Sequence, residues 1–380
     1  MFDYESLKLI WWVLVGVLLI GFALTDGFDL GAAALMPFVG KTDSERRVVI
    51  NTIAPHWDGN QVWLITAGGA LFAAWPLVYA ASFSGFYWAM LLVLFALFVR
   101  PVGFDYRSKL ADPRWRQAWD WGLFVGGLVP ALVFGVAFGN LLLGVPFELD
   151  STLRSSYQGN FWQLLSPFGL LAGLVSLSML LLHGGTWLMM RTDGDVARRS
   201  RRAVQLFAAV FLLCFSGAGL WLWLGNIQGL VISSGFDANA GLNPLSKSVV
   251  TGNPGWLANY STYPLSQLAP LGGILGALLA LAAASGQRAG LAFVGSSLAI
   301  TGTLCTAGFA LFPFIMPSSI DAASSLTVWD AVSSHKTLGI MLVAACIFIP
   351  LILCYTLWGY VKMWGKVTTA QIEGNSHGLY

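Results

Sequence analysis

The sequence predicts an all-α polytopic membrane protein. Hydrophobic residues make up 57% of its 380 positions, charged residues only 10%, and the mean hydropathy is +0.71. A soluble globular domain carries about 25% charged residues, so most of this surface does not face water. Several apolar stretches are long enough for an α-helix to cross a bilayer. The formal net charge of +2 gives no support to nucleic-acid binding.

A single integral membrane domain with nine spans is expected over residues 1–380. Its last residues, 362–380, are expected to form a solvated tail. The spans lie at about 9–37, 50–75, 77–99, 119–144, 163–190, 204–226, 264–285, 290–314 and 337–361. The first is expected to be a retained span, because it is too long for a signal peptide and no basic segment precedes it.

The distribution of positive charge predicts the orientation of these spans. Sixteen of the twenty lysines and arginines fall in the loops after odd-numbered spans or in the C-terminal tail. The opposite side holds only Lys8, Arg154, Lys247 and Lys336. Positive charge accumulates on the cytoplasmic side of membrane proteins. The N-terminus is therefore expected outside the cytoplasm and the C-terminus inside it.

The stretch APHWDGNQVW, residues 54–63, places several polar groups at the start of an apolar run. At 100° per residue, His56, Asn60 and Trp63 share one face of a helix, while Asp58 and Gln61 lie on nearly the opposite face. A helix that is polar on two faces presents neither of them cleanly to lipid. We expect this turn to be buried between helices or between subunits, either as a proton or cofactor site or as a cluster that fixes helix packing.

Asp26 and Asp29 are spaced to share one face of the first span. Two carboxylates so placed do not both ionise easily without a nearby cation. One interpretation is a proton relay; the other, which we favour, is an ion pair with Arg100. His183 lies within the fifth span and is interpreted as a hydrogen-bonded core residue in preference to a haem ligand. Asp120 is expected to favour the N-terminus of the fourth span.

Four long blocks and the final HGLY closely resemble subunit II of the bacterial cytochrome bd quinol oxidase. The blocks are residues 2–31 (FDYESLKLIWW to FDLG), 45–76 (ERRVVINTIAPHWDGNQVW to AAWP), 97–109 (LFVRPVGFDYRSK) and 312–338 (FPFIMPSSID to SSHKTL). The similarity extends from the first residues to the last and is weaker around 195–262.

This resemblance implies a fold of two four-helix bundles and one peripheral helix. The helices would be 1–4 at about 9–144, 5–8 at about 163–314, and a peripheral ninth at about 337–361, by the spans predicted above. It also implies an inner-membrane enzyme that oxidises ubiquinol or menaquinol and reduces dioxygen to water. Protons would come from the cytoplasm, so that a proton motive force forms without pumping.

The resemblance also implies partners and cofactors. Subunit I would hold two b-type haems and haem d, and a small single-helix accessory subunit would join the complex. The present chain would ligate no haem itself, would support subunit I, and would in some members hold a bound ubiquinone. Quinol and dioxygen would be substrates of the whole complex, and membrane lipids would surround it.

By position in the matching motifs, Asp58 resembles the carboxylate of the family's proton route in this subunit. Trp57 and Trp63 flank it. Three further residues match polar positions of the family within or beside the membrane: Asp29, Arg100 and Asp120. The resemblance implies no haem-ligand role for His56 or His183.

Two other functions remain to be weighed. An ion-coupled secondary transporter would use Asp26, Asp29 and Asp58 as coupling sites, but such proteins often have paired broken spans in related halves, and TDG at 25–27 has no clear mate. A purely structural partner would use the polar cluster only to fix a subunit interface.

Overall fold

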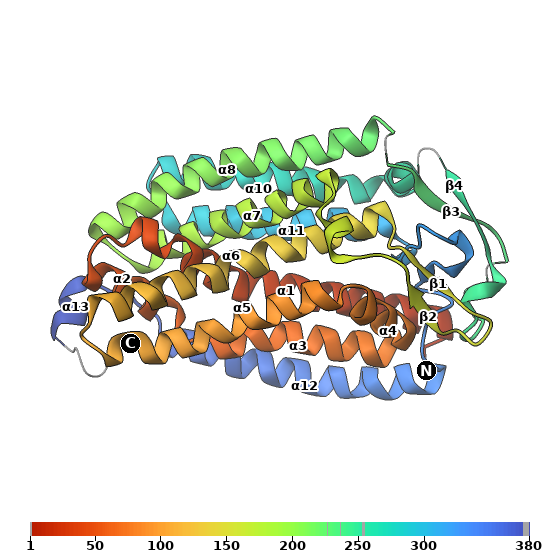
Figure 1. The fold of residues 1–380 in the computed structure, drawn as a ribbon, viewed down its shortest axis with the longest axis horizontal. Coiled ribbons are helices and arrows are strands. Elements are labelled where there is room, and N and C mark those ends of the chain that lie inside the picture. Colours follow the sequence, from red (N-terminus) through yellow and green to blue (C-terminus); the bar gives the residue numbers. More distant parts are fainter. Residues whose placement is uncertain (1, 226, 236, 253–254, 375–379) are drawn as a thin grey trace.

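Long apolar helices run roughly side by side along the longest axis of the molecule (Figure 1). The computed structural model describes residues 2–225, 227–235, 237–252, 255–374 and 380. The helices are α1 (Tyr4–Val39), α2 (Asp43–Ile53), α3 (Trp57–Ala74), α4 (Pro76–Gly85), α5 (Tyr87–Tyr106), α6 (Pro113–Leu143), α7 (Pro167–Arg191), α8 (Gly194–Trp223), α9 (Ala258–Thr262), α10 (Leu268–Ser285), α11 (Ala289–Leu311), α12 (His335–Lys362) and α13 (Thr369–Gly374). The strands are β1 (Phe147–Leu149), β2 (Ser155–Tyr157), β3 (Gly229–Ser234), β4 (Ser248–Gly252), β5 (Phe314–Met316) and β6 (Leu326–Thr327).

Eight helices of the described chain are long and apolar enough to cross a membrane, which confirms the prediction of an all-α polytopic membrane protein. They are α1, α5, α6, α7, α8, α10, α11 and α12. The predicted span at 50–75 has a different form. Residues 43–53 form α2, a turn follows, and α3 begins only at Trp57. Helix α3 has 18 residues and a polar first turn and is not among these eight, although it packs beside α1 and α12.

The predicted span at 77–99 also begins elsewhere. Trp75 leaves the helical conformation, with φ −131° and ψ 73°, because the residue before a proline is pushed away from α geometry. Pro76 then starts the separate helix α4. The helix is interrupted again at Phe86, and α5 begins at Tyr87. The predicted third span therefore corresponds to α5, and α4 is a short helix ahead of it.

Helices α1, α3, α5 and α6 pack as one group of four and α7, α8, α10 and α11 as another, with α12 outside both groups. The first four pack as α1 on α3 and α6, and α5 on α6. The second four pack as α7 on α8 and α11, and α10 on α8 and α11. Helix α7 joins the groups through α1 and α6. Helix α12 packs mainly against α1 and α3, and it lies along the edge of the molecule opposite to α8 (Figure 1).

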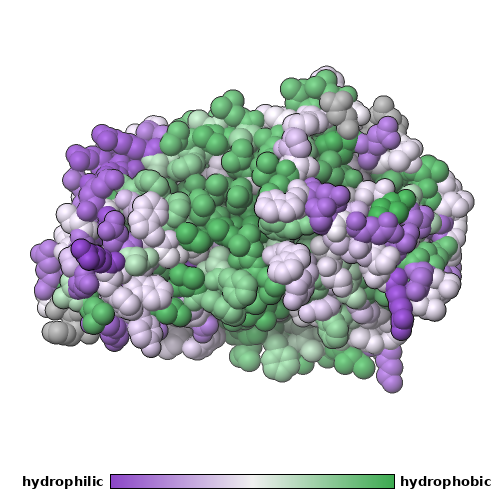
Figure 2. All heavy atoms as spheres, viewed as in Figure 1, coloured by the Kyte–Doolittle hydropathy of each residue, from purple (hydrophilic) through white to green (hydrophobic). Residues whose placement is uncertain are grey.

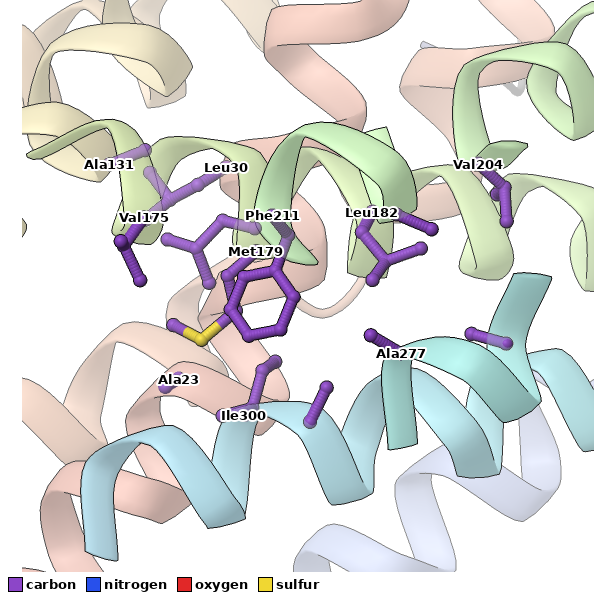
Figure 3. Packing of buried hydrophobic residues seen from close by; sticks show 14 of the residues in the cluster. Ala23, Leu30, Ala131, Val175, Met179, Leu182, Val204, Phe211, Ala277 and Ile300 are labelled. Atoms are coloured by element: carbon purple, nitrogen blue, oxygen red, sulfur yellow. The ribbon is translucent and has the colours of Figure 1, made fainter. Parts of the chain in front are cut away.

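A hydrophobic core joins the two groups of helices. Leu30 of α1, Met179 of α7, Phe211 of α8 and Ile300 of α11 are all buried in one cluster (Figure 3). Burial of each such side chain removes apolar surface from its surroundings, and dense packing also adds many weak dispersion contacts. This core sets the relative positions of the helices that carry the polar residues described below.

The two ends of the bundle differ in character. One end, which we call the hairpin end, carries three two-stranded antiparallel sheets: β1–β2, β3–β4 and β5–β6. Lys8 is fully buried there and donates to the carbonyl oxygens of Ala238, Ala240 and Trp329. The other, the basic end, carries α2, α13 and the arginine-rich turns. Figure 2 shows hydrophobic residues in a band between hydrophilic residues toward both ends.

Glycines allow the two groups of helices to approach closely. A Cβ atom on Gly31 of α1 would lie 2.0 Å from the carbonyl oxygen of Leu180 in α7. The small residues Gly135 and Gly139 of α6 likewise face Ala172 of α7, and small residues four positions apart are typical of close helix contacts in membranes. Helix backbones can meet at these points only because side chains are absent.

Gly31→Ala is expected to destabilise the protein by about 1–3 kcal/mol, because the added methyl group must separate α1 from α7. Thermal unfolding of the purified protein in detergent measures the effect. Gly217→Ala in α8 is the control, since no heavy atom lies within 4 Å of the added Cβ. Equal melting temperatures for the two variants would contradict close α1–α7 packing at this glycine.

Candidate functional site

A buried ion pair joins α1 and α5 inside the bundle. The guanidinium of Arg100 donates to both carboxylate oxygens of Asp26, at 2.9 Å from Nη1 and 2.6 Å from Nη2. Both side chains are fully buried. The ion-pair interpretation of the sequence is therefore confirmed. This pairing also argues against a transporter in which Asp26 binds a coupling ion, because both carboxylate oxygens are already occupied.

Asp29 lies beside this pair, one turn further along α1. Its Oδ2 is 3.9 Å from Nη2 of Arg100 and accepts a 2.8 Å hydrogen bond from Nδ2 of Asn60. Its Oδ1 is buried and has no hydrogen-bond partner among the described residues. One guanidinium thus faces two carboxylates in a setting that water does not reach, which is an arrangement that can hold or release a proton.

Helix α12 contributes to the same cluster through Tyr360. The Tyr360 hydroxyl donates a 2.5 Å hydrogen bond to Oδ1 of Asn60. Its ring stacks on the imidazole of His56, with centroids 4.4 Å apart and an interplanar angle of 5°. Asn60 therefore connects Tyr360 to Asp29. An amide can order these groups, but it is a poor carrier of protons because it must lose an N–H bond to pass one on.

Asp58 lies on the other face of α3. It is exposed in this chain, whereas Asn60 and His56 are buried. The helical wheel thus separates these residues correctly, and the expectation of burial between helices is wrong for Asp58. The other alternative, burial of Asp58 between subunits, stays a prediction.

The two tryptophans that flank Asp58 pack within the chain. The ring of Trp63 covers Gly21 of α1, where an added Cβ would lie 2.4 Å from the ring. Trp57 is half-buried, and its ring centroid lies 6.3 Å from that of Phe104. Both side chains fix the position of α3 against its neighbours, so they hold Asp58 outward and Asn60 inward.

Asp120 belongs to a separate network at the basic end. It accepts from Arg107 at 2.5 Å and from Arg46 at 2.7 Å, and Arg107 also pairs with Asp43 at 2.9 Å. The expectation that Asp120 favours a helix N-terminus is wrong, because α6 begins at Pro113 with Asp112 as its cap. The network instead ties α2, α6 and the turn after α5 together.

A further ion pair joins α2 to α8 near this network. Burial raises the pKa of Glu45, but a 2.5 Å bond from Arg199 and two backbone N–H bonds outweigh burial, so its pKa lies below the usual range. Glu45 also completes the capping box that begins α2 at Thr42. Ion pairs therefore hold α2, α6, α8 and the turn after α5 together at the basic end.

His183 offers little to a haem iron. Nδ1 of His183 lies 2.8 Å from Oγ of Ser296, and Nε2 lies 2.9 Å from the carbonyl oxygen of Leu24. Both ring nitrogens are thus engaged within the chain, which agrees with the interpretation as a hydrogen-bonded core residue. No group of three or more metal-ligating side chains occurs within the described part of the chain. The residues around His183 do not fit a haem.

The sequence profile of the family described as "Cytochrome bd terminal oxidase subunit II" matches residues 7–363. The chain belongs to this family. It is 57% identical over 380 residues, all of both chains, to "Cytochrome bd-I ubiquinol oxidase subunit 2" of Escherichia coli (strain K12). It is 33% identical over 356 residues, 93% of this chain and 95% of the other, to "Cytochrome bd ubiquinol oxidase subunit 2" of Bacillus subtilis (strain 168).

Solved structures support the fold of this bd oxidase subunit. "The structure of bd oxidase from Geobacillus thermodenitrificans" contains a chain that superposes with a TM-score of 0.65 at 13% identity, covering 94% of this chain and 98% of that one. Members of the family are subunits of an oxidoreductase, and the resemblance inferred from the sequence is confirmed.

The bd oxidase subunit brings only some of the sequence-predicted site residues together. Asp29 and Arg100 share one buried cluster, Asp120 lies in the basic-end network, and Asp58 faces outward. Sequence reasoning missed Tyr360 as a member of the cluster. Its only signal was a phenol in the last two turns of a span, which an interfacial aromatic residue also shows.

Arg100→Met is expected to destabilise the subunit by about 3–5 kcal/mol, because it leaves buried carboxylates without their cation. Unfolding of the purified complex by heat measures the loss. Arg198→Met is the matched control, since its pair with Asp195 is 54% exposed on both sides and such pairs contribute about 1 kcal/mol or less. Similar losses in both variants would contradict the importance of the buried pair.

Proposed function

We propose that this chain is subunit II of a quinol:dioxygen oxidoreductase of the bd type. The complex would oxidise ubiquinol or menaquinol, reduce dioxygen to water, and take protons from the cytoplasm, so that a proton motive force forms without pumping. The membership of the family and the printed names of full-length relatives support this function. The observation that carries it is the family match over residues 7–363 together with eight membrane-crossing helices.

We further propose that the haems, two of the b type and one haem d, are held by subunit I. The engaged nitrogens of His183 support this division, because they leave that residue no free nitrogen for iron. The present subunit would position its partner and complete a proton route. A small single-helix subunit is expected to join the complex.

The surface proposed for subunit I combines α12 and α3. Helix α12 exposes large apolar side chains along its length, including Ile340, Ile347 and Leu351, each at least 60% exposed. Helix α3 packs against α12 and exposes Asp58, where a carboxylate facing lipid would be costly. A protein partner can cover the apolar side chains and give Asp58 a polar environment, which lipid cannot do.

Asp58 is proposed as the proton-route carboxylate of this subunit, with the Asp29–Arg100 cluster and Trp57 and Trp63 in support. Two features favour this role. Asp58 lies at the basic end of α3, which the positive-inside pattern assigns to the cytoplasm. It also has no ion pair or hydrogen bond within the described chain, so its carboxylate is free to exchange protons with a partner.

The membrane orientation is part of the proposal. The basic end would face the cytoplasm with the C-terminus, and the hairpin end would face the periplasm with the N-terminus, in the bacterial inner membrane. A bound ubiquinone is proposed for the apolar cavity of about 800 Å³ between α1, α6, α7, α8, α10 and α11. Tyr260 and Gln267 supply polar groups at its wall.

Asp58→Asn is expected to lower quinol-driven oxygen uptake about tenfold or more while haem content stays at the wild-type level, because an amide cannot transfer the proton. Oxygen consumption per haem, measured on the purified complex, is the readout. Asp193→Asn is the control: it makes the same change on an exposed residue that makes no side-chain cap bond at α8. Unchanged turnover in Asp58→Asn would favour a purely structural role.

Ile347→Trp is expected to separate this subunit from its haem-bearing partner, because a bulky side chain cannot fit a packed interface. Leu213→Trp in α8 is the control, since Leu213 is 75% exposed on the opposite edge and lipid chains can rearrange around it. Purification through a tag on this chain, followed by reduced-minus-oxidised spectra, measures the bound haem. Full haem recovery with Ile347→Trp would contradict the proposed surface.

A further inference from the structure

Helices α8 and α10 form an exposed face on the edge of the molecule opposite to α12 (Figure 1). We call it the α8–α10 face. Its basic end carries Arg201, Arg202 and Arg288, and its apolar part carries Leu206, Leu213, Leu275 and Leu278. This face plays no part in the site described above.

The three arginines have no side-chain partner among the residues that the structure describes. Arg202 and Arg288 are exposed and Arg201 is half-buried, and none makes a side-chain hydrogen bond or ion pair with a described residue. Their neighbours differ. Arg198 pairs with Asp195 at 2.9 Å, and Arg199 pairs with Glu45 at 2.5 Å. The basic end thus pairs several of its arginines internally, and these three arginines are among the cations that it leaves without an ion pair.

A hydrogen bond joins α8 to α10 close in sequence to the three arginines. Nε2 of Gln205 in α8 donates to Oγ of Ser285 in α10 at 3.1 Å. Arg201 and Arg202 lie within one turn before Gln205, and Arg288 follows Ser285 by three residues. The nearest carboxylate on the α8 side, that of Asp195, is already paired with Arg198. The result is a positive cluster that spans both helices.

An apolar surface continues from this cluster toward the middle of the bundle. Leu206 and Leu213 of α8 and Leu275 and Leu278 of α10 are all exposed. Figure 2 shows hydrophilic residues over the basic end of α8 and the hydrophobic band directly beside them. Along this face, positive charge lies at the level of the membrane surface and leucines lie at membrane depth. An anionic phospholipid has the matching groups in the same order, a negative headgroup followed by apolar acyl chains.

We propose that the α8–α10 face binds an anionic phospholipid of the membrane. Its phosphate would accept from the guanidinium groups of Arg201, Arg202 and Arg288, since arginine presents a planar fork of donors that matches phosphate oxygens. Its acyl chains would lie along the leucines. A membrane lipid fits better than a protein partner, because the polar groups are confined to the headgroup level. The proposal does not depend on the proposed oxidase function.

Native mass spectrometry of the purified complex, with added phosphatidylglycerol or phosphatidylcholine, tests this site. The wild type is expected to retain phosphatidylglycerol in preference to phosphatidylcholine. Each arginine removed in the triple variant R201Q/R202Q/R288Q should weaken that retention about fivefold. If the triple variant does not assemble, the single variant R202Q replaces it, and its retention of phosphatidylglycerol is expected to be about fivefold weaker than that of the wild type.

The matched control is K41Q/K109Q/R114Q, which removes three exposed positive charges from the same end of the bundle but away from this face. It is expected to keep the preference for phosphatidylglycerol. Equal retention of both lipids by the wild type, or an equal loss in the control, would overturn the proposal. Displacement of the lipid by millimolar inorganic phosphate would show a free-anion site and would overturn it as well.

Discussion

One guanidinium that serves two buried carboxylates is the constraint on which the rest of this structure depends. Arg100 binds Asp26 through two hydrogen bonds and lies 3.9 Å from Asp29, and water reaches none of the three. Desolvated charges are tolerated only where opposite charge and hydrogen bonds replace water. Asn60 supplies one such bond from α3. The positions of α1, α3 and α5 are therefore fixed by electrostatics as well as by packing.

The same constraint gives α3 two different faces. Its inner face must supply Asn60 to Asp29 and must accept Tyr360 from α12, so it is polar at a depth where lipid would not tolerate it. Its outer face carries Asp58, which nothing in the described chain neutralises. A helix with this composition is stable in a membrane only when both faces are covered. The outer face of α3 therefore requires a further protein surface to cover it.

The sequence predicts the parts of this arrangement that depend on local spacing. Asp26 and Asp29 share a face because they are three residues apart, and the helical wheel separates Asn60 from Asp58. The break between α2 and α3 was not predicted, because the polar turn and the apolar run read as one span. Tyr360 was also missed, because it meets Asn60 across 300 positions of the chain, and periodicity carries no information at that range. Asp120 finds Arg46 and Arg107 for the same tertiary reason.

Unmatched charge then identifies the surfaces that need something outside the chain. The basic end pairs Asp43, Glu45 and Asp120 with arginines, so those residues hold the subunit together and require no partner. Asp58 on one edge and the arginines of the α8–α10 face on the other are not matched in this way. A carboxylate at membrane depth requires a polar protein neighbour, whereas guanidinium groups above exposed leucines suit an anionic lipid. The sign and depth of these charges are therefore the basis on which a protein partner is proposed at Asp58 and an anionic lipid at the α8–α10 face.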